Sequence, residues 1–269
     1  MDIEPVNIFT VDLEDWYLTD DYLIDKSRFN EFERNLIQNT EIILELLKVS
    51  KNKATFFVLG KIAEMIPSLV NEIISEGHEI ASHGYNHKLI SAMSPEEFKI
   101  DIEKTNCAIN DATGIFPVGY RAPYFVFLPW MIEILRENGL KYDSSINIRW
   151  LNKWKDVVNT VELGQTNNFS IFPIQNYNIF GMNIPNCGGG YFRLYPYKIF
   201  KALFDKSINP FGMRIFYIHP WDICNSLDKK QIKLLSRFKN FYNTSSTINK
   251  LERLMEDYRF NSFREYLEK

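Results

Sequence analysis

The sequence predicts a single α/β domain built on parallel strands. Apolar runs of strand length alternate with segments of helical periodicity through the first 145 residues, which is typical of a parallel sheet or barrel. Acidic, histidine and arginine side chains stand at the ends of these apolar runs, where parallel folds gather their active sites. No repeat, low-complexity stretch or Gly/Ser linker divides the 269 residues, so one domain spanning 1–269 is expected.

The strands expected in the first half are short and apolar. The run at 6–11 is apolar on both faces and ends in acids, as a buried parallel strand does. Further strands are expected at 54–59, 78–82, 118–121 and around Tyr142.

Helices are expected between these strands, at 32–50, 62–76, 95–113 and 129–138. Gly77 and Gly139 end two of them, as glycine often does after a helix. Ser94, Pro95 and Glu97 form a helix start, with serine as N-cap, proline at the first position and glutamate at the third. The second half is less regular, with strands expected at 169–174, 179–184 and 213–218 and helices at 197–206, 227–241 and 247–257.

Composition and charge exclude several classes of protein. The net charge of −3 gives the chain no overall basic character to attract nucleic acid or an anionic membrane. The N-terminus has no basic segment before an apolar run, and no stretch reaches the ~18 apolar residues of a membrane span. Three scattered cysteines make no disulfide framework. A cytoplasmic location is therefore expected.

A pair of histidines is the strongest single signal for function. His83 and His87, in the segment HGYNH, are spaced i,i+4, which on a helix stacks two imidazoles on one face. Two imidazoles, one carboxylate and a water make a hydrolytic metal site. The acids Asp12, Glu14 and Asp15 end the first strand and can supply the carboxylate.

Together these segments resemble the NodB-like polysaccharide deacetylases, most closely the branch encoded with bacterial exopolysaccharide and surface-glycan biosynthesis. The resemblance is carried in order by 10–16 (TVDLEDW), 54–57 (ATFF), 78–87 (HEIASHGYNH), 119–124 (GYRAPY), 142–145 (YDSS), 188–193 (GGGYFR) and 218–222 (IHPWD). It implies a distorted (β/α)7 barrel of the NodB-homology type, with helices from about 227–269 completing it. It also implies a metal-dependent hydrolase that removes an acetyl group from an N-acetylated sugar of a surface polysaccharide or its precursor.

The resemblance assigns roles around one divalent transition metal, most often zinc in this family. His83 and His87 match its imidazole ligands, and Asp12 matches the base that activates the metal-bound water. Many family members have two adjacent aspartates here, whereas this chain has Asp12, Glu14 and Asp15. Because residues i and i+2 of a strand share a face, Glu14 is favoured as the carboxylate ligand. A turn after Leu13 would favour Asp15 instead.

Further residues complete the implied mechanism. Arg121 matches the arginine that pairs with the base, and His219 matches the acid that protonates the leaving amine. Asp143 is the first candidate to orient His219, with Asp222 second.

Five residues are expected at the substrate. The backbone N–H of Tyr124 matches the family's oxyanion donor. The glycine run 188–190 is expected either to let the backbone pass close to a sugar or to form a flexible turn. Sugar contacts are expected from Trp16, Tyr191, Arg193 and Trp221.

Two other functions fit the same fold. One is an amide hydrolase acting on a small molecule that is not a glycan, and the other is a glycan-binding relic without activity. The completeness of the expected site favours the deacetylase. The expected partner is a glycan or glycan precursor, with no nucleic acid and no transmembrane segment, and the oligomeric state is not defined by the sequence.

Overall fold

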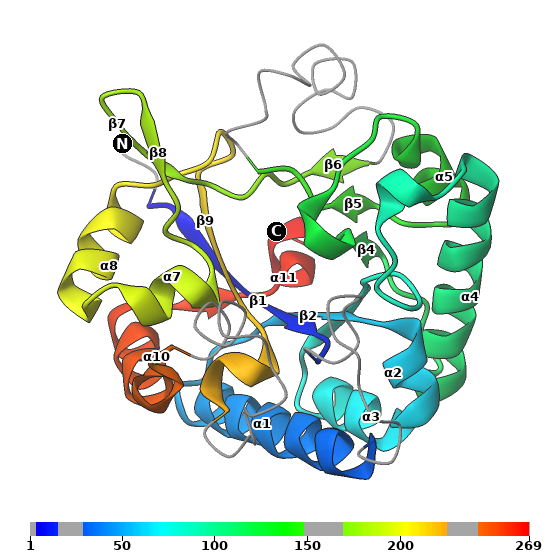
Figure 1. Cartoon of the computed structure of the whole chain (residues 1–269), viewed down its shortest axis with the longest axis horizontal. Helices are drawn as coiled ribbons and strands as arrows, with labels where there is room; N and C mark the ends of the chain where they lie inside the picture. The colour runs from blue at the N-terminus through cyan, green and yellow to red at the C-terminus, as the bar shows by residue number, and fades with distance from the viewer. Residues whose placement is uncertain (1–3, 16–28, 148–168, 225–241, 269) are drawn as a thin grey trace.

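Parallel strands curl around a common axis with helices on the outside (Figure 1). The computed structural model describes residues 4–15, 29–147, 169–224 and 242–268. The strands are β1 (Val6–Leu13), β2 (Thr55–Val58), β3 (Glu79–Ser82), β4 (Gly119–Tyr120), β5 (Tyr142–Asp143), β6 (Ser170–Ile171) and β9 (Met213–Ile218). Their order is β9-β1-β2-β3-β4-β5-β6, every neighbouring pair is parallel, and the predicted fold class is confirmed.

The barrel is not closed by a strand ladder between β6 and β9. Instead, the side chain of Gln175 donates from Nε2 to the carbonyl of Ile215 at 2.8 Å and accepts from the Ile215 N–H at 2.9 Å. Farther along, the N–H of Tyr217 donates to the carbonyl of Cys187 at 2.8 Å. A buried amide therefore takes the place of strand pairing, because it satisfies both backbone groups of the facing residue.

The described helices other than α11 lie on the outside of the sheet (Figure 1). The helices are α1 (Phe29–Val49), α2 (Gly60–Met65), α3 (Pro67–Ser75), α4 (Pro95–Thr113), α5 (Met131–Glu137), α7 (Gly189–Leu194), α8 (Tyr197–Asp205), α10 (Thr247–Asp257) and α11 (Phe263–Leu267). The capping box at the start of α4 is confirmed: the N–H of Glu97 donates to the Ser94 hydroxyl and the N–H of Ser94 to the Glu97 carboxylate. None of the described helices has the length and apolar content that crossing a bilayer requires.

One predicted helix is two. The segment expected at 62–76 breaks between α2 and α3, because Pro67 disfavours helical backbone at the residue before it. Ile66 accordingly has φ −134° and ψ 59°. The helix expected at 227–241 lies outside the described residues.

The C-terminus returns to the start of the sheet. Strand β10 (Phe260–Asn261) pairs with β1 at Asn7 and Ile8. Helix α11 then closes the amino end of the barrel, where the N–H of Phe263 donates to Thr55 Oγ1 and the N–H of Arg264 to the Glu79 carboxylate. Rings of Phe57, Tyr142, Phe172 and Phe263 pack above this plug. The interior is therefore filled, and the open end is the carboxyl end of the strands.

A two-stranded antiparallel hairpin stands outside the barrel. It consists of β7 (Tyr177–Ile179) and β8 (Met182–Ile184), joined by Phe180 and Gly181, both with positive φ. The strand predicted at 179–184 thus ends in β8, and the strand predicted at 169–174 contains the shorter β6.

Candidate metal centre and active site

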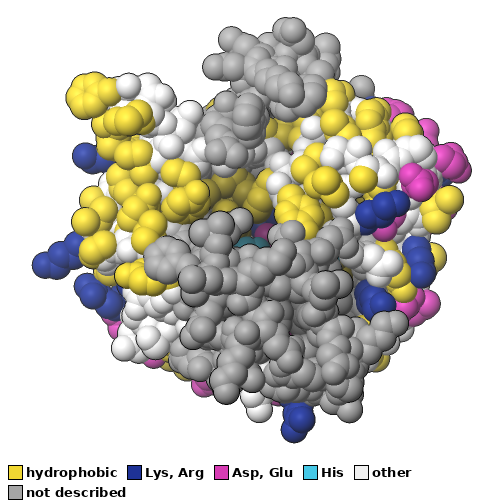
Figure 2. All heavy atoms as spheres, in the orientation of Figure 1, with side chains coloured by type: hydrophobic (Ala, Val, Ile, Leu, Met, Phe, Trp, Pro, Cys, Tyr) yellow, Lys and Arg dark blue, Asp and Glu magenta, His cyan; other side chains and the backbone are white. Residues whose placement is uncertain are grey.

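The predicted site residues meet at the carboxyl end of the strands. Asp12 lies on β1 and Glu14 directly after it, His83 follows β3, Arg121 follows β4 and His219 follows β9. All but His219 are nearly inaccessible to solvent. In Figure 2 a histidine side chain is visible at the bottom of a hollow near the middle of the molecular face.

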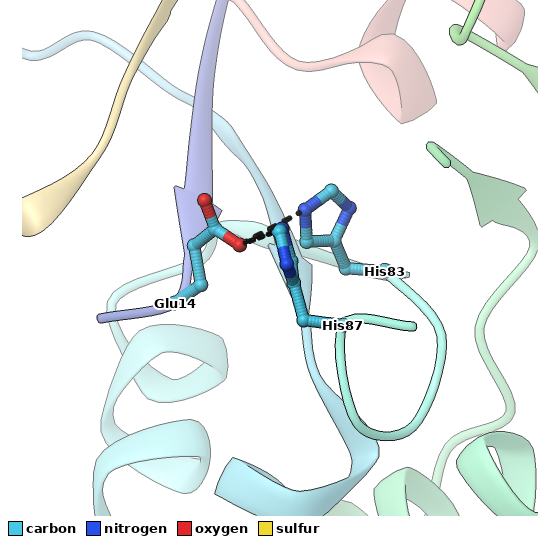
Figure 3. A group of neighbouring side chains, drawn as sticks. All are labelled: Glu14, His83 and His87. Carbon is cyan, nitrogen blue, oxygen red and sulfur yellow. Dashed lines mark ion pairs between the residues drawn. The ribbon is translucent and has the colours of Figure 1, made fainter. Parts of the chain in front are cut away.

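Glu14, His83 and His87 form a cluster that could hold a metal ion (Figure 3). One ligand atom from each lies within 4.8 Å of the others. Oε2 of Glu14 is 3.6 Å from Nε2 of His83 and also contacts Nε2 of His87. Asp15 is buried but is not part of this cluster, so the structure brings Glu14 and not Asp15 to the histidines.

The two histidines do not lie on a helix, so the stacked arrangement considered from the spacing is wrong. His83 continues from β3, and the chain then turns through Gly84 (φ 76°) and reaches His87 in a left-handed conformation (φ 58°). The N–H of Tyr85 donates to the Asp101 carboxylate at 2.9 Å and ties this turn to α4. The imidazoles converge with ring centroids 5.5 Å apart. A loop therefore supplies the convergence that the sequence spacing attributed to a helix.

The cluster has the donor chemistry of a divalent metal site. Nδ1 of His83 lies 2.8 Å from the carbonyl of Arg121, and only a protonated Nδ1 can donate to a carbonyl. In the neutral imidazole this leaves the Nε2 lone pair facing Glu14, as in metal-binding histidines whose other nitrogen is fixed by a carbonyl. Burial opposes ionisation of Glu14, but the neighbouring His87 and His83 outweigh it and hold the pKa of this carboxyl well below its ordinary value. Two imidazole nitrogens and an ionised carboxylate suit zinc and other first-row divalent metals.

Arg121 holds Asp12 in a fully buried ion pair. Its Nη1 lies 2.7 Å from Oδ1 of Asp12 and donates also to Thr10 Oγ1 at 2.8 Å. Nε and Nη2 donate to the backbone carbonyl and hydroxyl of Ser144 at 3.2 and 3.1 Å. The guanidinium is thus fixed on three sides, and the other oxygen of Asp12, Oδ2, lies toward His219. Thr10 and Ser144 stand inside sequence segments typical of the family, but no role was predicted for either.

His219 lies beside Asp12 because β1 and β9 are neighbours. The register pairs Val11 with Ile218, so the next residues, Asp12 and His219, adjoin. Nε2 of His219 is 3.9 Å from Oδ2 of Asp12 and 3.4 Å from Oε1 of Glu14. Burial lowers the pKa of His219, but the Asp222, Glu14 and Asp12 carboxylates together raise it above the ordinary value.

The structure places Asp222, and not Asp143, against His219. Oδ2 of Asp222 lies 3.1 Å from Nδ1 of His219 and accepts the His219 backbone N–H at 2.8 Å. Asp143, the first candidate, is several strands away on β5 and accepts from the hydroxyl and N–H of Ser145 instead. Burial raises the pKa of Asp143 to about 6. The prediction for Asp143 as the partner of His219 is therefore wrong.

Arg193 and the glycine run pack against Asp222 and hold it in place. Nε of Arg193 is 2.9 Å from Oδ1 of Asp222, and both side chains are almost completely buried, so the predicted sugar contact by Arg193 is wrong. A Cβ added to Gly189 would lie 2.1 Å from Oδ2 of Asp222, and one added to Gly188 would lie 2.3 Å from the Tyr217 ring. The first two glycines are therefore required for close packing, which differs from both sequence interpretations.

The other predicted substrate residues differ in exposure. Tyr124 is 45% exposed, has φ 58°, and its ring meets the His87 ring edge-on at 4.6 Å. Tyr191 is 39% exposed and is available to a ligand. Trp221 is buried and stacks on His219 with centroids 4.1 Å apart, so it is not the exposed sugar platform that was predicted. Trp16 lies outside the described residues.

Comparison with known proteins gives two family matches. Residues 23–143 match the family model described as polysaccharide deacetylase, and residues 154–268 match a domain of unknown function, DUF3473. A peptidoglycan-N-acetylglucosamine deacetylase of Bacillus cereus is 31% identical over 126 residues, covering 41% of this chain and 46% of that protein. A peptidoglycan deacetylase of Helicobacter pylori is 33% identical over 120 residues, covering 44% and 41%. The chain thus spans less than half the length of these relatives.

Solved structures share the fold at low sequence identity. A Mycobacterium smegmatis protein assigned to the polysaccharide deacetylases has a TM-score of 0.63 at 18% identity, covering 100% of this chain and 91% of that one. A CE4 family pseudoenzyme from Bacillus anthracis has a TM-score of 0.57 at 15% identity, covering 97% and 65%. The predicted barrel type is confirmed by these likenesses.

Proposed function

We propose that this chain, whose residues 23–143 match the polysaccharide deacetylase family, is a metal-dependent hydrolase that removes an acetyl group from an N-acetylated sugar. The substrate class proposed is a surface polysaccharide or its precursor. The observation that carries the proposal is the juxtaposition of a three-donor metal cluster with the carboxylate of Asp12 and the imidazole of His219.

The cluster supplies the first part of the chemistry. A divalent cation held by Glu14, His83 and His87 would polarise the acetyl carbonyl and make a water more acidic. Asp12, paired through Oδ1 with the guanidinium of Arg121, accepts the proton of the attacking water through its other oxygen, Oδ2. We further propose that the backbone N–H of Tyr124 donates to the oxyanion that forms on the acetyl carbon.

His219 supplies the second part. An amine is a poor leaving group until its nitrogen is protonated, so the site needs an acid as well as a base. His219 Nε2 lies toward Asp12 and Glu14 while Nδ1 is held by Asp222, and Arg193 fixes Asp222 in turn. Donation of the Nε2 proton to the amide nitrogen breaks the C–N bond and releases acetate and the free amino sugar.

The test is acetate release from N-acetylglucosamine oligosaccharides and from peptidoglycan, comparing the wild-type protein with Asp12→Asn. The variant retains the metal ligands, so elemental mass spectrometry should find about one equivalent of metal in both proteins. We expect turnover to fall by about 10²-fold or more in the variant, the usual contribution of a general base.

Two outcomes would contradict the proposal. Near-normal acetate release by Asp12→Asn would remove Asp12 as the base. Metal binding by the wild-type protein without acetate release from any acetylated glycan, but with hydrolysis of small amides, would favour the small-molecule alternative.

A further inference from the structure

The β7–β8 hairpin carries apolar side chains that contribute nothing to the core. Phe180 at its turn is 100% exposed and Met182 is 64% exposed. The hairpin projects from the barrel at the upper left of Figure 1. A protruding turn has no need of a phenylalanine for folding, because a turn is ordinarily polar and glycine-rich. We call Tyr177–Ile184 the apolar hairpin.

The sequence around the apolar hairpin lacks charged residues. Residues 169–192 contain no Asp, Glu, Lys or Arg, whereas about six would be expected at the average of 24% charged residues. Eleven of these 24 residues are buried, so burial accounts for part of the absence, but none of the eight hairpin residues 177–184 is buried and none is charged. A projecting hairpin that carries apolar side chains and no charge is suited to an environment from which water is excluded.

The apolar surface continues from the hairpin along the neighbouring helices. Leu194, Ile199 and Ile208 are each about half exposed, at the end of α7, on α8 and just beyond α8. Figure 2 shows hydrophobic side chains gathered over the hairpin and over α7 and α8, on the face that also holds the hollow of the active site. The apolar surface therefore borders the entrance through which a substrate would pass.

Lysines accompany this surface. Residues 194–208 hold Lys198, Lys201 and Lys206 against one acid, Asp205; Lys201 pairs with Asp257 at 3.1 Å, which leaves Lys198 and Lys206 as the cations of this surface. Lys198 and Lys206 are exposed, and the Lys206 ammonium lies 5.9 Å from the Tyr177 ring centroid of the hairpin. Apolar side chains beside lysines form the combination that binds the interface of an anionic bilayer.

We propose that the apolar hairpin and the adjoining face of α8 dock on an anionic lipid membrane, with Phe180 and Met182 entering the bilayer interface. A projecting turn can enter lipid, whereas a flat or concave surface would suit a protein partner better. Docking would hold the active-site hollow close to the bilayer, where a membrane-attached glycan is presented. The proposal goes beyond the hydrolytic function and does not depend on it.

The test is flotation with vesicles of phosphatidylcholine and phosphatidylglycerol, compared with vesicles of phosphatidylcholine alone. The wild-type protein should float with the anionic vesicles, and less so as salt rises. The double variant Phe180→Ser/Met182→Ser should lose at least tenfold in binding, since the two side chains would no longer be buried in the interface. Lys198→Glu/Lys206→Glu should lose about fivefold per lysine or more.

The matched control is Phe116→Ser, which removes another exposed phenylalanine, 59% exposed and just before the amino end of β4. It should bind vesicles like the wild type.

Equal binding by wild type and Phe180→Ser/Met182→Ser would overturn the proposal, as would the absence of flotation. Light scattering that shows a dimer lost in the double variant would assign the hairpin to a second copy. Loss of chitooligosaccharide binding instead of vesicle binding would assign it to the glycan. Acetate release from a soluble substrate is measured separately, so its failure is distinguishable.

Discussion

At the scale of single residues, the two carboxylates of the site, Asp12 and Glu14, differ in the groups that contact them. Asp12 is held by a permanent cation, and Glu14 faces two imidazoles. Asp12 therefore has a permanent counter-charge without a metal, whereas Glu14 has none among the side chains it contacts. A buried carboxylate of this kind is costly unless a cation compensates it. The same strand end thus carries one residue suited to proton transfer and another suited to ligation.

Asp222→Asn tests the partner of His219. An asparagine has the same shape but no charge to favour the protonated imidazole, so kcat should fall by about 10²-fold, while metal content stays unchanged. KM should change little, because Asp222 is buried behind His219. The measurement is steady-state kinetics of acetate release with metal content determined in parallel.

Asp143→Asn is the matched control for that prediction. It makes the same substitution in another buried aspartate, whose contacts are with Ser145. Its kcat should stay within about threefold of the wild type, with any larger effect seen in thermal stability. A greater loss of kcat in Asp143→Asn than in Asp222→Asn would restore Asp143 as the partner of the acid.

At the scale of elements, the start of helix α7 and the turn after β9 fit each other without a gap. Gly189→Ala would put a methyl group 2.1 Å from Oδ2 of Asp222. Either α7 or Asp222 must move, and overpacking of this kind costs about 1–3 kcal/mol. We expect a lower melting temperature and a fall in kcat with metal binding retained, measured by calorimetry and by acetate release.

The neighbouring glycine supplies the comparison. At Gly190 the nearest atom to an added Cβ is Nη2 of Arg193, 3.8 Å away, which is an ordinary contact. Gly190→Ala should therefore keep both the melting temperature and kcat close to the wild type. Equal loss in the two variants would mean that the glycines serve chain flexibility instead of packing.

The sequence predicted elements where the local signal is complete within the element itself. The capping box of α4 and the apolar run of β1 are of this kind, and both lie where expected. The proline that breaks the helix at Pro67 is visible in the sequence. The apolar periodicity continues on both sides of it, however, and this favoured a single helix. The hydrogen bonds by which Gln175 closes the barrel could not be predicted. Its partner Ile215 is 40 residues away, and no sequence pattern identifies which backbone groups a glutamine side chain will bind.

Site residues follow the same division. Asp12, Glu14 and the two histidines stand at strand ends, and parallel topology brings strand ends together. Asp222 and Arg193 meet because two glycines allow α7 to approach β9 and the turn after it, and that approach depends on tertiary packing. The sequence therefore indicated the residues at the strand ends more reliably than Asp222 and Arg193, which position His219 through tertiary contacts.

At the scale of the whole molecule, His78 makes stability depend on pH. Its side chain is 5% exposed, and its Nδ1 accepts the N–H of Ala54 at 3.3 Å. Burial, with Lys53 nearby, lowers its pKa from 6.5 to about 4. The unfolded chain therefore binds a proton that the folded one does not. The stabilisation is complete above pH 6.5 and is lost as pH falls toward 4, by about 3 kcal/mol.

His78→Asn should flatten this dependence, because an amide oxygen can accept the same N–H without titrating. The measurement is urea unfolding at pH 7 and pH 4.5 for both proteins. The difference in unfolding free energy between the two pH values should be about 2–3 kcal/mol larger for the wild type. Other acidic groups contribute equally to both proteins, so an identical difference in the two would contradict the assignment to His78.

The central position of β1 has a consequence for folding during synthesis. This first strand pairs with β9 and β10, and its contacts reach across 206 residues to Phe216 and 252 residues to Arg259. While the chain is being translated, β1 leaves the ribosome long before these partners exist, with Phe9 and Val11 unprotected. Contacts of such separation form slowly and expose apolar surface meanwhile. The nascent chain therefore needs shielding until β9 and β10 have been synthesised, and Asp12 and His219 can stand side by side only once β9 has paired with β1.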